Sequence, residues 1–246
     1  MRKLFLLATM IGALSASSAG AQVVIMDQIG TDPATLGTAI NASQRFADFP
    51  AFDIGVGDNF TVPAGPGVTL TQVQAVFNGF SGFVNANYTN GVLTQWSVEI
   101  YSSTAAATAN LTGNVASFSA AFNAPSVNVT PYGSVAPGQS LVTLDVSSAS
   151  ITLAPGSYFV AVIPSMPFGT GGQLGVVNNA TFGGFPNDGN AWQANPGGGF
   201  AIPGNFQSIN NNSAYRIVGT PVPEPTSMAL VGIGAVGFAL RRWRKK

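Results

Sequence analysis

Polar and apolar residues alternate with a period of two along several short stretches of this chain. The clearest stretch is 96–101, in which Trp96, Val98 and Ile100 share one face. Glu99 falls on the other face. A period of two predicts a half-buried β-strand, so we expect Glu99 to point into solvent.

Similar stretches, separated by Gly- and Pro-containing turns, continue between the two ends of the chain. Residues 158–163 are apolar on both faces, which is typical of a central strand. Within 32–45, Asp32 as N-cap and Pro33 at the first position predict one short helix. Many short strands with such turns predict an all-β fold, an antiparallel β-sandwich, of which a jelly roll is one form. The other predicted strands are 68–77, 115–122, 142–146, 174–177 and 215–217.

The first apolar run of the chain is typical of a targeting segment. Two basic residues precede the apolar residues 4–14, and small residues follow, with Ala19 and Ala21 in an A-x-A arrangement. A basic start, a short apolar run and a small-residue cleavage site are the parts of a secretory signal peptide. The sequence therefore predicts a signal peptide over 1–21 and an exported domain, the body, over 22–221.

A second apolar run, residues 228–240, lies near the C-terminus. As a helix it spans about 20 Å of a hydrocarbon core that is about 30 Å thick, so flanking residues must lengthen it. Basic residues tend to stay in the cytoplasm, which places the body on the far side of the membrane. The sequence thus predicts a transmembrane helix over 228–240, followed by a cytoplasmic basic anchor. The anchor residues are Arg241, Arg242, Arg244, Lys245 and Lys246.

A proline-rich motif, residues 222–227, joins the body to this helix. Its central residues are Val222, Pro223, Glu224 and Pro225. Proline resists helix formation, which keeps the segment extended just outside the bilayer. The motif, apolar helix and basic end of 222–246 together resemble the PEP-CTERM sorting signal. The resemblance implies cleavage near the motif by an exosortase, a membrane-embedded processing enzyme, and delivery to the cell surface or to an extracellular polysaccharide matrix.

The composition of the body excludes several classes of function. Residues 22–221 include two basic and eight acidic side chains, a formal charge of −6. Such a body repels phosphate backbones, so we expect no nucleic acid partner. The chain has no Cys and no His, which removes thiol and His-based catalysis and nearly every transition-metal site built on those ligands.

The candidate sites left in the body each have a structural alternative. Asp48, Asp53 and Asp58 recur every five residues and offer calcium ligands, although turns and strand ends also use Asp. A carboxylate hydrolase needs two placed acids, and Glu99 is the only glutamate of the body. Trp192 follows a turn and is our first choice for stacking on sugar rings, with core packing as the alternative. Other aromatic residues in loop-rich sequence are Phe80, Phe83, Tyr88, Phe182, Phe185, Phe200 and Phe206.

We therefore expect a non-enzymatic protein with a structural or adhesive role and no cofactor, calcium being the one alternative. A polysaccharide-binding module that uses Trp192 and a secreted hydrolase that uses Glu99 stay open. The expected partners are an exosortase and the membrane, with extracellular polysaccharide as a further alternative. The expected location is first an inner-membrane-anchored precursor and then the cell surface or extracellular matrix.

Overall fold

The computed structural model describes residues 21–133, 138–179 and 184–223. The predicted signal peptide, including Ala19, lies outside the described residues except for its last position. The tail from residue 224 onward, with its predicted membrane helix and basic anchor, lies outside them as well. Within the described ranges, no helix is long and apolar enough to cross a membrane.

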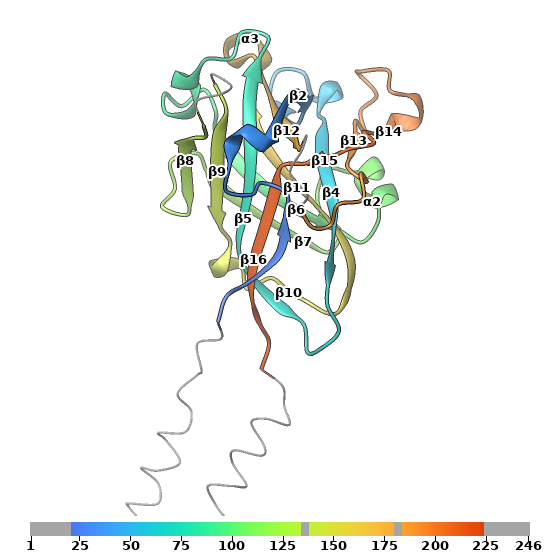
Figure 1. Cartoon of the computed structure of the whole chain (residues 1–246). Helices are drawn as coiled ribbons and strands as arrows, with labels where there is room; N and C mark the ends of the chain where they lie inside the picture. The colour runs from blue at the N-terminus through green and yellow to red at the C-terminus, as the bar shows by residue number, and fades with distance from the viewer. Residues whose placement is uncertain (1–20, 134–137, 180–183, 224–246) are drawn as a thin grey trace, which may run out of the picture.

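The fold is all-β, as predicted, and consists of two sheets that are antiparallel except at one short pairing (Figure 1). The first sheet has the order β1-β16-β5-β12-β15, to which β2, β8, β9 and β10 add. Its strands are β1 (Val23–Asp27), β2 (Leu36–Ala42), β5 (Val68–Phe80), β8 (Val127–Pro131), β9 (Ser140–Asp145), β10 (Thr152–Leu153), β12 (Gln173–Asn179), β15 (Asn212–Ser213) and β16 (Tyr215–Pro221).

The second sheet has the order β14-β13-β4-β11-β6-β7, and β3 pairs with β11 in parallel. Its strands are β3 (Arg45–Phe46), β4 (Gly55–Val62), β6 (Gln95–Tyr101), β7 (Ala116–Ala121), β11 (Gly156–Met166), β13 (Trp192–Ala194) and β14 (Phe206–Ser208).

Helices are short and lie in the connections between strands. The described helices are η1 (Pro33–Thr35), η2 (Pro50–Phe52), η3 (Asn85–Tyr88), α2 (Thr104–Ala109), η4 (Ser147–Ala149), α3 (Phe168–Gly171) and η5 (Pro203–Asn205). Asp32 caps η1 as predicted, since its carboxylate accepts a hydrogen bond from the Ala34 N–H at 2.9 Å. The helix is a single turn, because the backbone is already extended at Leu36 and continues into β2.

The main core lies between the two sheets. Val98 of the second sheet and Leu70 and Phe77 of the first are fully buried in one apolar cluster. Burial of apolar surface is the dominant favourable contribution to folding. Tyr215 also joins the sheets, because its hydroxyl donates a hydrogen bond to the carbonyl of Val56 at 2.7 Å. Smaller apolar clusters cover the outer faces of both sheets.

Every stretch predicted to be a strand is present, as β5, β6, β7, β9, β11, β12 and β16. In β9, Val142 and Leu144 are buried and Asp145 is exposed, as a period of two requires. β6 differs, because both of its faces are buried. The prediction that Glu99 points into solvent is therefore wrong: α2 and the loop at 110–114 cover the outer face of β6.

The two ends of the described chain leave the sandwich at the same place. β1 and β16 are antiparallel neighbours, so β1 begins where β16 ends (Figure 1). β5 runs away from that place: Val68 pairs with Pro221, and Phe80, its last residue, pairs with Gln173. Its 13 residues span about 40 Å at roughly 3.3 Å per residue. We call the end at Pro221 the tail pole and the end at Phe80 the distal pole.

Candidate functional site

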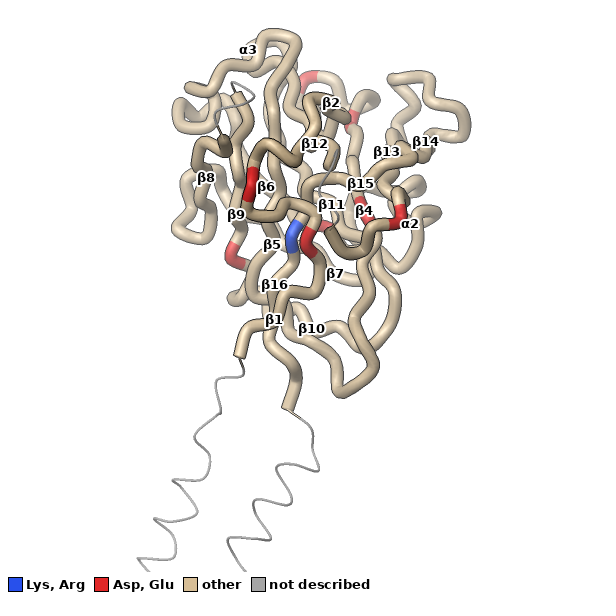
Figure 2. The backbone as a smooth tube through the Cα atoms, viewed as in Figure 1, with Lys and Arg blue, Asp and Glu red and all other residues tan. Residues whose placement is uncertain are grey.

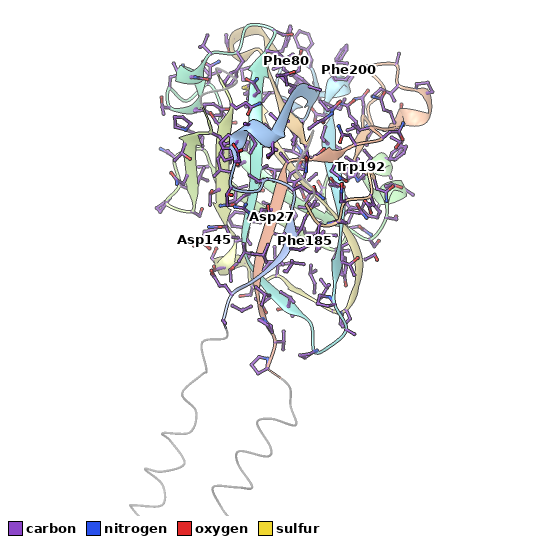
Figure 3. The ribbon with its side chains drawn as sticks, viewed as in Figure 1. Asp27, Phe80, Asp145, Phe185, Trp192 and Phe200 are labelled. Carbon is purple, nitrogen blue, oxygen red and sulfur yellow. The ribbon has the colours of Figure 1, made fainter. Side chains whose placement is uncertain are left out.

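A half-open cavity of about 380 Å³ lies at the distal pole. Five phenylalanines and one glutamine line it, and we call it the phenylalanine cup. The lining residues are Phe46, Phe49, Phe52, Phe168, Gln173 and Phe200. Three of the rings are unusually exposed for phenylalanine: Phe49 is 50% exposed, Phe168 40% and Phe52 38%. Figure 3 labels Phe200 and Phe80 at this pole, far from the point where the chain ends leave.

The rings of the cup contact one another through their edges. The closest pair is Phe52 and Phe200, whose centroids are 5.1 Å apart at an interplanar angle of 87°. Phe49 contacts both Phe52 and Phe168, and Phe46 contacts Phe168 and Phe200, with centroids 6.2–6.5 Å apart. Edge-to-face packing of this kind is favourable beyond the area that it buries. The five rings therefore form one connected wall.

Three of these rings come from a single segment, the last residue of β3 and the loop that joins β3 to β4. Phe46, Phe49 and Phe52 follow one another at intervals of three residues, which suits a turn such as η2 and not the alternating faces of a strand. The loop is closed at its base by an antiparallel bridge in which Gln44 and Ile54 exchange backbone hydrogen bonds of 2.7 and 2.9 Å. This bridge thus holds the two ends of the loop next to each other.

The two aspartates of this loop are used as braces. The Asp53 carboxylate accepts a hydrogen bond from the Phe46 N–H at 2.7 Å. The Asp48 carboxylate accepts from the N–H groups of Phe168 and Gly169, at 2.8 and 2.9 Å, and so joins the loop to α3. Partial desolvation acts to raise the pKa of Asp48, but the hydrogen bonds from Gly169 and Phe168 outweigh it and hold that pKa below its ordinary value.

A buried asparagine fixes the loop that carries Phe200. Asn195 is fully buried, and its amide nitrogen donates to the carbonyls of Ala51 and Asp53 at 3.0 and 2.7 Å. Its amide oxygen accepts from the Phe200 N–H at 2.9 Å. Buried polar groups that are fully hydrogen-bonded rigidify the segments they join. The cup is therefore assembled by polar side chains beneath it, while its rings stay partly exposed.

A second buried amide anchors the other side of the cup. Gln44 is fully buried, and its amide nitrogen donates to the carbonyls of Met166 and Gly172 at 3.3 and 3.2 Å. Its amide oxygen accepts from the Leu174 N–H at 2.9 Å. These bonds connect Gln44, which lies just before β3, to both ends of the segment that contains α3. The backbone behind Phe168 is therefore fixed as well.

None of the residues that line the cup is charged. Figure 2 shows that charged positions are few on the described body and that most of them are acidic. Within the described part of the chain the only cations are Arg45 and Arg216, and both are paired. Arg45 lies 2.9 Å from Glu99, and Arg216 lies 3.1 Å from Asp27. No cation among these residues is therefore free to hold an anionic ligand at the cup.

Trp192, the residue expected to stack on sugars, is in a different place. It is 1% exposed and packs between Tyr101 and Phe206, with ring centroids 5.7 and 6.4 Å away. A Cβ added at Gly57 would lie 2.3 Å from its ring, so β4 closes over one face of the indole. Of the two alternatives given for Trp192, the structure agrees with packing and not with an exposed stacking face: Trp192 is a packing residue of the second sheet's outer face (Figure 3).

Glu99 also differs from the position expected of it. It is 1% exposed, and its two carboxylate oxygens are engaged, one by Arg45 at 2.9 Å and the other by the Gly113 N–H at 2.8 Å. Arg45 in turn donates to Ser97 and to the carbonyl of Leu111. This pair ties β3, β6 and the loop after α2 together, which is a structural use of both charges.

The aspartates considered for calcium are not brought together. Asp48 and Asp53 brace the cup, whereas Asp58 is fully buried and accepts from the Ser213 N–H at 2.8 Å and from Asn59. Burial raises the pKa of Asp58 to about 7 despite these two hydrogen bonds. In the described residues, no three acidic side chains gather as a metal site would require.

One local sequence pattern points to the cup. Of the lining residues only Phe200 was among the loop aromatics considered, and Phe46, Phe49, Phe52 and Phe168 were missed. The three-residue spacing of phenylalanine in a segment with no strand alternation is the local signal. That Phe168 and Phe200 join them is a long-range property, which no local pattern records.

The C-terminal tail carries the signal that sorts the protein. Residues 221–245 match the PEP-CTERM protein-sorting motif. The motif implies an exported protein that an exosortase sorts from a membrane-anchored precursor. Its first residue, Pro221, is the last residue of β16 and lies at the tail pole. No match was found among curated proteins or solved structures, and the motif assigns the β-sandwich to no family.

Proposed function

We propose that this protein is a non-enzymatic surface or matrix protein with an adhesive role, displayed by its tail and binding through the phenylalanine cup. The proposal includes removal of a signal peptide over 1–21, with Ala19 and Ala21 at the cleavage site, before sorting. The observation that carries it is that the sorting motif begins at Pro221, at one pole of the sandwich, whereas the cup lies at the opposite pole.

This placement suits display because the body separates the two ends. β5 alone spans about 40 Å between them. Among the described residues, the last backbone hydrogen bond from the tail to the body joins the Val222 N–H to the carbonyl of Gly67 at 3.0 Å. Cleavage near Pro223 would therefore leave β16 complete. Whether the tail is cut or kept, the cup faces away from the attachment point.

The exported form can be tested by its intact mass. We expect a species outside the inner membrane that begins near Gln22 and ends near Pro223. A species that still ends at Lys246 would remove exosortase cleavage from the proposal, and one that begins at Met1 would remove the signal peptide.

The adhesive role can be tested on whole cells. The double variant Phe49→Asp with Phe52→Asp places charge in the cup while altering only partly exposed positions. We expect cells that display it to lose retention on a surface to which wild-type cells adhere. Phe185→Asp is the matched control, because Phe185 is 50% exposed, like Phe49, but does not line the cup. Equal retention of the cup variant and the wild type, at equal surface amounts, would refute the role.

A further inference from the structure

The size of the cup is that of a small-ligand site. Its volume of about 380 Å³ lies within the roughly 300–1,000 Å³ that ligand pockets occupy. The exposed parts of Phe49, Phe52 and Phe168 together amount to little more than one ring, on the order of 250 Å². A stable protein interface buries roughly 800 Å² on each partner. The cup therefore fits part of a small molecule and is too small to hold a second copy of this chain by itself.

The chemistry of the lining excludes charged and sugar ligands. Neither arginine of the described body is free, and the nearby carboxylates of Asp48 and Asp53 already accept backbone hydrogen bonds. Gln173 is the only polar residue of the lining. Placing sugar hydroxyls against phenylalanine rings without hydrogen-bond partners would cost free energy for each hydroxyl.

The geometry of the rings favours a flexible ligand over a flat one. The ring pairs of the cup meet at interplanar angles of 59–87°, so no two rings form a parallel slot that would clasp a planar group. An aliphatic chain needs no such slot, because dispersion contacts are non-directional and a chain can follow rings of any orientation.

We propose that the phenylalanine cup binds one uncharged aliphatic chain. The inference rests on the proposed adhesive function and names the chemistry of what is bound. The hydrogen bonds of Asp48, Asn195 and Gln44 support it, because they hold the rings in place before any ligand arrives. A pre-organised apolar site loses less entropy on binding than one that must first assemble.

The test is competition in detergent-free buffer, using the exported protein recovered from outside the cell. Parinaryl alcohol, an uncharged linear polyene dye with the shape of an aliphatic chain that fluoresces in apolar sites, reports occupancy. We expect saturable binding of the dye and its displacement by 1-octanol. Octanoate, at a pH where it is ionised, should compete at least about tenfold less well, because its carboxylate finds no cation. Glucose should not compete.

Variants connect the signal to the cup. Phe49→Ala and Phe52→Ala should weaken 1-octanol competition by about tenfold, because each removes part of the apolar surface that the chain would bury. Phe185→Ala should leave it unchanged. No saturable dye binding, equal competition by octanoate or glucose, or an equal loss in Phe185→Ala would each overturn the proposal. If such a result came with cells that still lose adhesion through Phe49→Asp and Phe52→Asp, the adhesive role would stand and only the ligand class would fall.

Discussion

The outer face of the second sheet and the phenylalanine cup use the same kinds of residue in opposite ways. On the sheet face, Trp192 is 1% exposed, and Glu99 is buried in a pair with Arg45. At the cup, aromatic rings stay up to 50% exposed, and buried polar groups such as Asn195 lie beneath them. On the outer face of the second sheet, aromatic and charged groups therefore stabilise the fold. At the cup, buried polar groups hold the backbone so that apolar rings stay exposed to a ligand.

Residue type alone therefore does not mark a site in this protein. Tryptophan and glutamate are the side chains that sequence reasoning selects for sugar stacking and acid chemistry, and both are packed away here. Phenylalanine usually packs in a core, yet in this protein phenylalanines line the cup. What separates the two cases is whether the surrounding backbone covers the side chain or is held back from it.

Removing Trp192 from the outer face of the second sheet should cause the largest loss of stability. Trp192→Ala empties the space between Tyr101 and Phe206 and should lower the free energy of unfolding by about 4 kcal/mol. Urea denaturation of the exported protein measures the loss. A change below about 1 kcal/mol would mean that the indole is not the packing centre of this face.

Removing Glu99 should cost somewhat less. Glu99→Ala leaves Arg45, whose side chain is 24% exposed, without its counter-ion, and also frees the Gly113 N–H. We expect a loss of about 3 kcal/mol in the same denaturation experiment. Glu99→Gln, which keeps a hydrogen-bond acceptor, should lose less. If both variants were as stable as the wild type, the pair would have no structural role.

Asp58 makes stability depend on pH. Its pKa is about 7 when folded, against 3.8 for the ordinary group, so the folded state holds a proton that the unfolded chain releases. The contribution is complete below pH 3.8 and is lost as the pH rises toward about 7. Asp58→Asn should flatten this part of the stability profile. An equal slope in the variant would assign the dependence to another group.

Asn195→Ala should loosen the loop that carries Phe200 and so weaken the cup. The variant leaves the carbonyls of Ala51 and Asp53 and the Phe200 N–H without their partner. We expect about 2 kcal/mol of destabilisation, together with weaker dye binding at the cup. Asn128→Ala, at an exposed position of β8, serves as the control and should change neither quantity. Dye binding that survives the loss of Asn195 would show that the brace is dispensable.

The smallest effect on stability is expected at the cup rings themselves. Phe49→Ala should change the free energy of unfolding by about 1 kcal/mol or less, because half of the ring is already in water. Compared with Trp192→Ala, it separates binding from folding. A loss as large as that of Trp192→Ala would place Phe49 in the core energetically and weaken the distinction between the two regions.

The strands could be predicted because their signal is local. The alternation of Val142, Leu144 and Asp145 records which face of β9 meets the core, and the structure follows it. The burial of Glu99 could not be predicted, because it depends on α2 and the loop at 110–114 folding back over β6. A period of two shows that a strand has two faces and says nothing about what covers the second.

The cup could be predicted only in part. The spacing of Phe46, Phe49 and Phe52 signals a turn rich in aromatic rings. Phe168 and Phe200 are more than a hundred residues further along the chain and reach the cup through α3 and the loop fixed by Asn195. The tail was readable because its motif, apolar run and basic end are contiguous in sequence.

The position of β16 has a mechanical consequence for a protein held by its tail. β16 ends at the tail pole, pairs with β1 along one side and pairs with β5 along the other. A pull on the tail against a ligand at the distal pole acts along these strands, at right angles to their hydrogen bonds. The two ladders then carry the load together in shear, so the attachment strand resists being peeled away one bond at a time.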